Sequence, residues 1–123
     1  MRAGWRCEYC LLPEEHGGYP HHVDHIVSRK HGGESGEDNL AFACPVCNRN
    51  KGTDVASLST VSGQPIRLFH PRRQAWPEHF QFVGPRIDPL SETGEATVRI
   101  LRLNDRWRVQ ERAASQLAEI PEA

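Results

Sequence analysis

The chain has 123 residues, of which 37% are hydrophobic and 7% aromatic, and its formal net charge is −1. A chain of this length and composition suits one domain with a modest apolar core, to which a bound metal ion can add stability. No stretch is apolar enough to span a membrane and no apolar leader precedes Cys7, so we expect a cytoplasmic protein without membrane attachment.

The first half of the chain predicts a metal-binding turn, two short strands and a helix. Its expected elements, in chain order, are a turn at 5–12, a loop at 13–20, a strand at 21–27, a Gly-containing loop at 28–38 and a strand at 39–43. The helix opens at Cys44-Pro45, because proline fits the first helical position, and Gly52 ends or weakens it.

The second half is predicted to wrap and extend the first. Residues 59–90, rich in Pro and Gly, are expected to form an extended segment, and helices should begin at about Thr93 and run from about Asp105 to Leu117. We therefore divide the chain into a core at 1–58 and a C-terminal wrapping and helical extension of the same domain at 59–123. The core contacts expected from the last helix are Trp107, Val109 and Leu117.

Four cysteines form two Cys-x-x-Cys pairs, Cys7 with Cys10 and Cys44 with Cys47. In a reducing compartment such pairs favour a metal over disulfides, and together they supply the four thiolates of a tetrahedral, closed and therefore structural zinc site. Four unrelated buried thiols and an iron–sulfur cluster are the alternatives. The pairs are separated by residues 11–43, more than the usual spacing of about 15–20 residues, which leaves room for an inserted functional element.

The triplet Val23-Asp24-His25 lies between the cysteine pairs, and Asn48 directly follows the last cysteine. Phosphodiester hydrolysis needs an activated water, a cation on the phosphate oxygens and stabilisation of the leaving oxygen. Histidine suits the base because it ordinarily titrates near neutral pH, and carboxylate and amide oxygens suit Mg²⁺ or Mn²⁺. Adjacent residues of a regular strand point to opposite faces, so Asp24 and His25 share one site only where the strand is distorted or ends.

The order and spacing of these residues resemble the HNH endonucleases, whose ββα-metal (His-Me finger) motif often lies in a four-cysteine zinc frame. The matching text is Cys7-x-x-Cys10, His22-Val23-Asp24-His25-Ile26-Val27, Gly32-Gly33, Asp38-Asn39-Leu40 and Cys44-Pro45-x-Cys47-Asn48-x-x-Lys51-Gly52. The likeness covers residues 7–52, and residues 64–103 resemble more weakly the tail of some small bacterial members. It implies an α+β fold: a small ββα-metal core stabilised by the zinc site, a C-terminal extended segment and two short helices.

By this resemblance His25 is the general base, Asp24 binds the catalytic divalent ion, and Asn39 braces the loop that holds His25. Asn48 is the second protein ligand of that ion and stands where the family name has its last histidine, which makes the chain an HNN-type variant. The loss of an imidazole favours Mg²⁺ or Mn²⁺ over Zn²⁺ or Ni²⁺. The plainer alternatives are a cap or ion pair for Asp24, a turn residue for Asn39 and a surface residue for Asn48.

Positive charge gathers in the middle of the chain, where residues 29–73 carry seven Lys or Arg against four Asp or Glu. This surplus suits phosphate contact, although an ordinary mixed surface has the same composition. The candidate phosphate contacts are Arg49, Lys51, Arg72 and Arg73. His70 is a further candidate for DNA contact, with a structural role preferred.

The sequence thus predicts a metal-dependent DNA endonuclease with structural Zn²⁺ and catalytic Mg²⁺ or Mn²⁺. DNA as the substrate follows from the resemblance alone, and without an identifiable recognition helix we expect no strong sequence specificity. The alternative function is a non-catalytic zinc module that binds nucleic acid or a protein partner. That alternative explains the cysteines but leaves the joint occurrence of the Asp, His and two Asn residues without a reason.

Overall fold

The computed structural model describes residues 3–16 and 18–118. Its N-terminal part contains the antiparallel strands β1 (His22–His25) and β2 (Leu40–Ala43), followed by helix α1 (Pro45–Lys51). The register pairs His22 with Ala43 and His25 with Leu40. Short 3-10 turns occupy the connecting loops at Glu14–His16, Arg29–His31 and Glu37–Asn39. The predicted order of strand, loop, strand and helix is confirmed, with proline in the first turn of α1 and Gly52 at its end.

The C-terminal part is more regular than the extended segment predicted for it. Its elements are β3 (Ala56–Leu58), β4 (Pro65–Arg67), α2 (Trp76–His79), β5 (Phe80–Val83), β6 (Arg86–Pro89), α3 (Glu92–Leu101) and α4 (Arg106–Ala118). β3 pairs with β4 and β5 with β6, each as an antiparallel hairpin. Gly63 and Gly84 have φ values of 71° and 57°, which the tight connections of these hairpins require. None of the described helices is long and apolar enough to cross a membrane.

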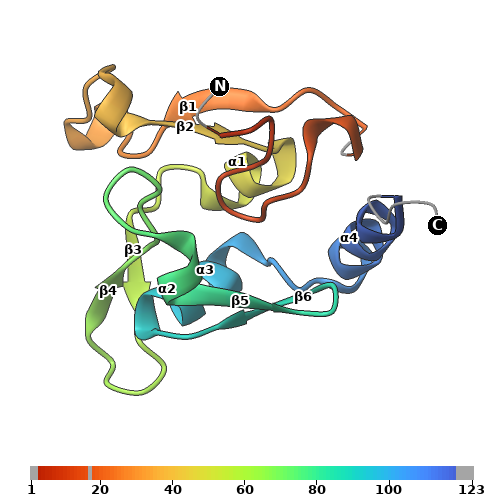
Figure 1. Cartoon of the computed structure of the whole chain (residues 1–123). Helices are drawn as coiled ribbons and strands as arrows, with labels where there is room; N and C mark the ends of the chain where they lie inside the picture. The colour runs from red at the N-terminus through yellow and green to blue at the C-terminus, as the bar shows by residue number, and fades with distance from the viewer. Residues whose placement is uncertain (1–2, 17, 119–123) are drawn as a thin grey trace.

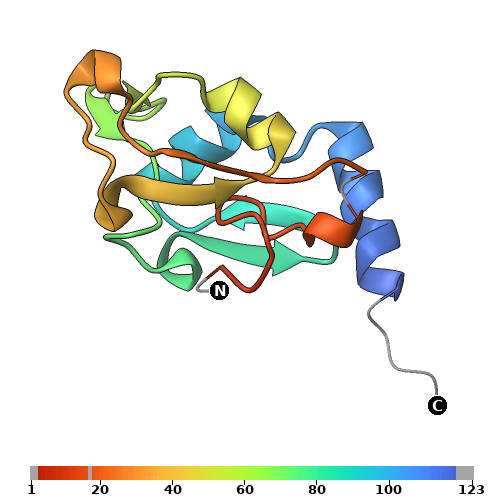
Figure 2. The same ribbon diagram turned by 90° about the horizontal axis from the view of Figure 1, so that it is seen from above.

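The elements surround a buried apolar cluster to which both parts of the chain contribute. The β1–β2 hairpin and α1 lie on one side, the β3–β4 and β5–β6 hairpins with α3 lie on the other, and α4 stands at one end (Figures 1 and 2). Phe80, Ile87 and Leu101 are fully buried in the cluster. The indole N–H of Trp76 donates to the carbonyl oxygen of Tyr9 at 2.8 Å, which ties α2 to the N-terminal cysteine turn.

Helix α3 begins as its sequence suggests, because the hydroxyl of Ser91 accepts from the backbone N–H of Gly94 at 3.0 Å. Helix α4 differs from the prediction in the face that it buries. Trp107 is 48% exposed and Leu117 70% exposed, so their expected core contacts are wrong. The residues that α4 buries are polar: Arg108, Arg112 and Ser115.

Replacing Phe80 by Ala should lower the free energy of unfolding by about 3–5 kcal/mol, because the ring is fully buried against Phe69 and Trp76. Phe82 on the same strand is 42% exposed and provides the matched control, for which Phe82→Ala should cost less than half as much. Urea denaturation of the zinc-loaded proteins measures both values. Equal costs for the two substitutions would contradict the placement of Phe80 in the core.

Candidate active site and zinc centre

The sulfur atoms of the four cysteines meet at one place in the structure. All four Sγ atoms lie within 4.8 Å of one another, and those of Cys10 and Cys44 are 3.8 Å apart. Zinc–thiolate bonds of about 2.3 Å place the sulfurs of a tetrahedron about 3.8 Å apart, so the cluster fits a zinc ion. Each cysteine is a free, buried thiol. The structure therefore confirms that the four cysteines are positioned to bind one metal ion, and their arrangement suits a closed structural site.

Each Cys-x-x-Cys turn also directs a backbone N–H at a sulfur. The amide of Cys10 donates to Cys7 Sγ at 3.5 Å, and the amide of Cys47 donates to Cys44 Sγ at 3.4 Å. Cys44 is the N-cap of α1, so the metal turn and the start of the helix are one structure. These donors stabilise negative charge on sulfur, as a metal-bound thiolate requires.

Without an ion, burial disfavours a thiolate at two of the four cysteines. Burial is the largest cause that raises the pKa of the Cys7 thiol and of the Cys47 thiol well above their ordinary value. A divalent cation reverses this balance because it keeps its coordinating thiols deprotonated. Metal binding and the folded arrangement of the cluster should therefore support each other.

Asn39 braces the loop between β1 and β2 through three side-chain hydrogen bonds. Its Oδ1 accepts from the N–H of Val27 at 2.9 Å, and its Nδ2 donates to the carbonyl oxygens of Val27 at 2.9 Å and Glu34 at 2.7 Å. Its own carbonyl oxygen accepts from the N–H of Ile26 at 2.9 Å. The two residues after His25 are thus fixed to Asn39 by their main chain.

Gly33 is the residue that permits this close packing. A Cβ atom at this position would lie 1.8 Å from the carbonyl oxygen of Val27 and 2.8 Å from Nδ2 of Asn39. The N–H of Gly33 donates to the carbonyl oxygen of Ser28 at 2.9 Å. Any side chain at Gly33, the second glycine of the predicted motif, would therefore displace the loop that Asn39 braces.

Asp24 and His25 approach each other although they are neighbours on a strand. His25 Nδ1 lies 3.8 Å from Asp24 Oδ1, and both residues are half-buried. The predicted conflict of strand faces does not arise, because β1 ends at His25. His25 Nε2 is hydrogen bonded to the hydroxyl of Ser35 at 3.0 Å, and that hydroxyl accepts from Arg29 Nη2 at 3.1 Å. Sequence reasoning missed Ser35 and Arg29, since loop residues of these types give no distinguishing pattern.

Asn48 and Lys51 lie on α1 with different surroundings. Asn48 is half-buried, and within the described residues its side chain makes no hydrogen bond, so its amide oxygen is available to a ligand. Lys51 is only 5% exposed and its ammonium donates to the carbonyl oxygen of Ile26 at 2.6 Å. Burial lowers the pKa of Lys51, while the charges of Asp24 and Asp54 act in the opposite direction. The ammonium of Lys51 is thus bound to the main chain just after β1, and its contact with phosphate stays a prediction.

The other candidate phosphate contacts differ in whether their side chains are buried or exposed. Arg72 forms an ion pair with Glu8 in which both side chains are largely buried, and its contact with phosphate stays a prediction. Arg49 and Arg73 are exposed, and within the described residues their side chains form no hydrogen bond or ion pair. His70 is 7% exposed, and its Nδ1 accepts from the N–H of Arg72 at 3.2 Å, which agrees with the structural role preferred for it.

The comparisons with known proteins agree with this geometry. Residues 7–54 match the family model described as HNH endonuclease, and this segment contains both cysteine pairs, the braced loop, both strands and α1. No curated protein and no solved structure matches the chain.

Replacing Cys44 by Ser should remove the zinc and unfold the first half of the chain, because a hydroxyl binds zinc poorly and metal binding is coupled to folding. The measurements are zinc content per chain after gel filtration and thermal unfolding followed by circular dichroism. A variant that kept one zinc per chain and a native melting curve would contradict the four-cysteine site.

Replacing Gly33 by Ala should break the contact between Asn39 and Val27, at a cost of about 1–3 kcal/mol. Hydrogen exchange of the Val27 amide, which bonds to Asn39 Oδ1, reports this opening directly. Gly36→Ala is the matched control in the same loop, because its Cβ would meet only the flexible side chain of Asp38 at 2.9 Å. Unchanged exchange in the Gly33 variant would show that the loop does not depend on this close approach.

Proposed function

We propose that the protein is a metal-dependent DNA endonuclease that hydrolyses phosphodiester bonds. The observation that carries this proposal is the loop braced by Asn39 and Gly33, which holds the main chain after His25 while His25 and Asp24 approach each other. A structural zinc module has no need of this arrangement. It occurs within the segment that matches the HNH endonuclease family model.

Asp24 and Asn48 are the residues that would hold the catalytic divalent ion, for which Mg²⁺ or Mn²⁺ is the proposed identity. The carboxylate of Asp24 is 47% exposed and the Asn48 side chain has no partner among the described residues, so both fit a solvent-facing oxygen site. When bound, such an ion neutralises phosphate oxygens and stabilises the leaving oxygen. Two protein ligands leave room for water and substrate, as Mg²⁺ ordinarily requires.

His25 is the proposed general base. His25 Nε2 is hydrogen bonded to the hydroxyl of Ser35, and Nδ1 lies on the side of Asp24. We assign the imidazole proton to Nε2, so that the Ser35 oxygen accepts from both His25 and Arg29 and Nδ1 carries the lone pair. Nδ1 then takes the proton of the attacking water.

Contact with DNA is assigned to exposed positive side chains outside the reacting centre. Arg49 follows Asn48 on α1, and Arg73 lies beyond the Arg72–Glu8 pair. Such side chains neutralise phosphates without distinguishing bases, so we propose cleavage without strong sequence specificity. Four free thiols that hold a metal suit a reducing compartment, and we place the protein in the cytoplasm.

His25→Ala should reduce nicking of supercoiled plasmid at least about 100-fold, since it removes the general base. The variant should keep its zinc and its melting temperature, because the His25 side chain bonds only to the exposed hydroxyl of Ser35. His22→Ala, at an exposed position of the same strand, is the matched control and should cleave at the native rate. Cleavage by the His25 variant at the native rate would exclude the proposed base.

The same assay tests whether cleavage requires a divalent ion. Native protein freed of weakly bound ions, and verified to retain its zinc, should be inactive until Mg²⁺ or Mn²⁺ is added. Undiminished cleavage in that metal-depleted state would contradict the catalytic ion at Asp24 and Asn48. Native protein that binds DNA but cleaves it with neither ion would instead support the non-catalytic zinc module.

A further inference from the structure

The buried side chain of Arg108, on α4, reaches the zinc cluster from the far end of the chain. It is only 2% exposed, and its Nη2 donates to Cys47 Sγ at 3.0 Å and to Cys44 Sγ at 3.6 Å. Its Nη1 donates to the carbonyl oxygen of Leu101 at 2.7 Å, at the C-terminal end of α3. Within the described residues it forms no ion pair with a carboxylate, so sulfurs and main-chain oxygens are its partners.

The charge of the cluster explains why an arginine is needed there. Four thiolates carry two more negative charges than one Zn²⁺ ion neutralises, and an uncompensated buried charge is costly. The guanidinium of Arg108 offsets half of that excess at hydrogen-bond distance.

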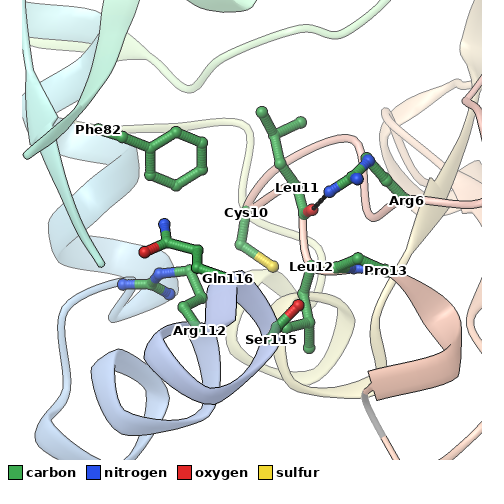
Figure 3. A pocket seen from close by; sticks show the side chains of 9 residues that line it. All are labelled: Arg6, Cys10, Leu11, Leu12, Pro13, Phe82, Arg112, Ser115 and Gln116. Atoms are coloured by element: carbon green, nitrogen blue, oxygen red, sulfur yellow. Dashed lines mark hydrogen bonds between the residues drawn. The ribbon is translucent and has the colours of Figure 1, made fainter. Parts of the chain in front are cut away.

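Helix α4 also covers the cluster beside Arg108. Arg112, Ser115 and Gln116 of α4 line a cavity of about 220 Å³, and Cys10 lies on its opposite wall (Figure 3). Arg112 is held on the carbonyl oxygens of Pro85 and Leu103, one helical turn after Arg108. Release of α4 would therefore open the Cys10 side of the cluster to solvent.

We propose that Arg108 is a positioning residue of the zinc site, through which docking of α4 and retention of the metal are coupled. Bound zinc keeps the cysteines as thiolates, and the thiolates hold Arg108 and with it α4. In return Arg108 stabilises the negatively charged metal complex and keeps the helix over Cys10. Because the coupling is thermodynamic, bound zinc must stabilise the docking of α4 by the same free energy by which docked α4 stabilises zinc binding.

The first test is the rate at which an excess of a chromogenic chelator removes zinc from the full chain. Arg108→Gln should release zinc at least about tenfold faster than the native protein, because it removes the counter-charge. Arg106→Gln alters an exposed arginine of the same helix and should release zinc at the native rate. Arg108→Lys keeps the charge but cannot bridge sulfur and Leu101 in the same way, so its rate should fall between the two. Native release from Arg108→Gln would overturn the proposal.

A second measurement uses the native chain and remains decisive if the Gln variant fails to fold. Hydrogen exchange of the amides of α4 and α3 is compared before and after zinc is withdrawn under reducing conditions. We expect α4 to lose protection with the metal and to regain it when zinc is returned. Protection of α4 that persisted without zinc would refute the coupling. Both measurements are independent of DNA cleavage, so the outcome for Arg108 is separate from that for the proposed nuclease.

Discussion

The four cysteine sulfurs meet at one position and so connect the N-terminal turn with the start of α1, which local structure alone would not hold together. Strands β1 and β2 have four residues each, and an isolated hairpin of this size is marginal in water. The cluster joins the N-terminal turn to Cys44 and Cys47, and Cys44 is also the cap of α1. The position of α1 against β1, and therefore of Asn48 relative to Asp24, depends on this cross-link.

On that frame, the segment after His25 is held from two sides. Asn39 satisfies both polar main-chain groups of Val27 and the N–H of Ile26, and Lys51 donates to the remaining carbonyl oxygen of Ile26. Every polar main-chain group of these two residues is therefore paired. The proposed role of His25, to present one nitrogen to a water molecule, gains from such a rigid support, because small misplacements of a catalytic group lower the reaction rate strongly.

The features predicted correctly from the sequence are those that short spacings determine. The two cysteine turns, the strand–loop–strand–helix order and the ends of α1 follow from residue types only a few positions apart. The intramolecular partners of Lys51 and Arg72, the Ile26 carbonyl and Glu8, could not be predicted because sequence shows a charge but not its partner. The packing of α4 was missed for a related reason: hydrophobic periodicity assumes that apolar residues face the core. This helix docks through Arg108 and Arg112, whose acceptors are main-chain carbonyl oxygens and, for Arg108, cysteine sulfurs far away in the chain.

The way in which Asn39 forms its contacts affects how this protein can change. Its amide bonds only to main-chain groups, those of Val27 and Glu34, and the close approach at Gly33 is likewise to a carbonyl oxygen. The fold of the loop at residues 28–38 is consequently set largely by main-chain contacts. Apart from Arg29 and Ser35, which bond at His25, and Gly33, substitutions there can alter what the loop presents to a substrate while the support of His25 stays intact. The loop is thus a natural place for new substrate preferences to evolve or to be engineered.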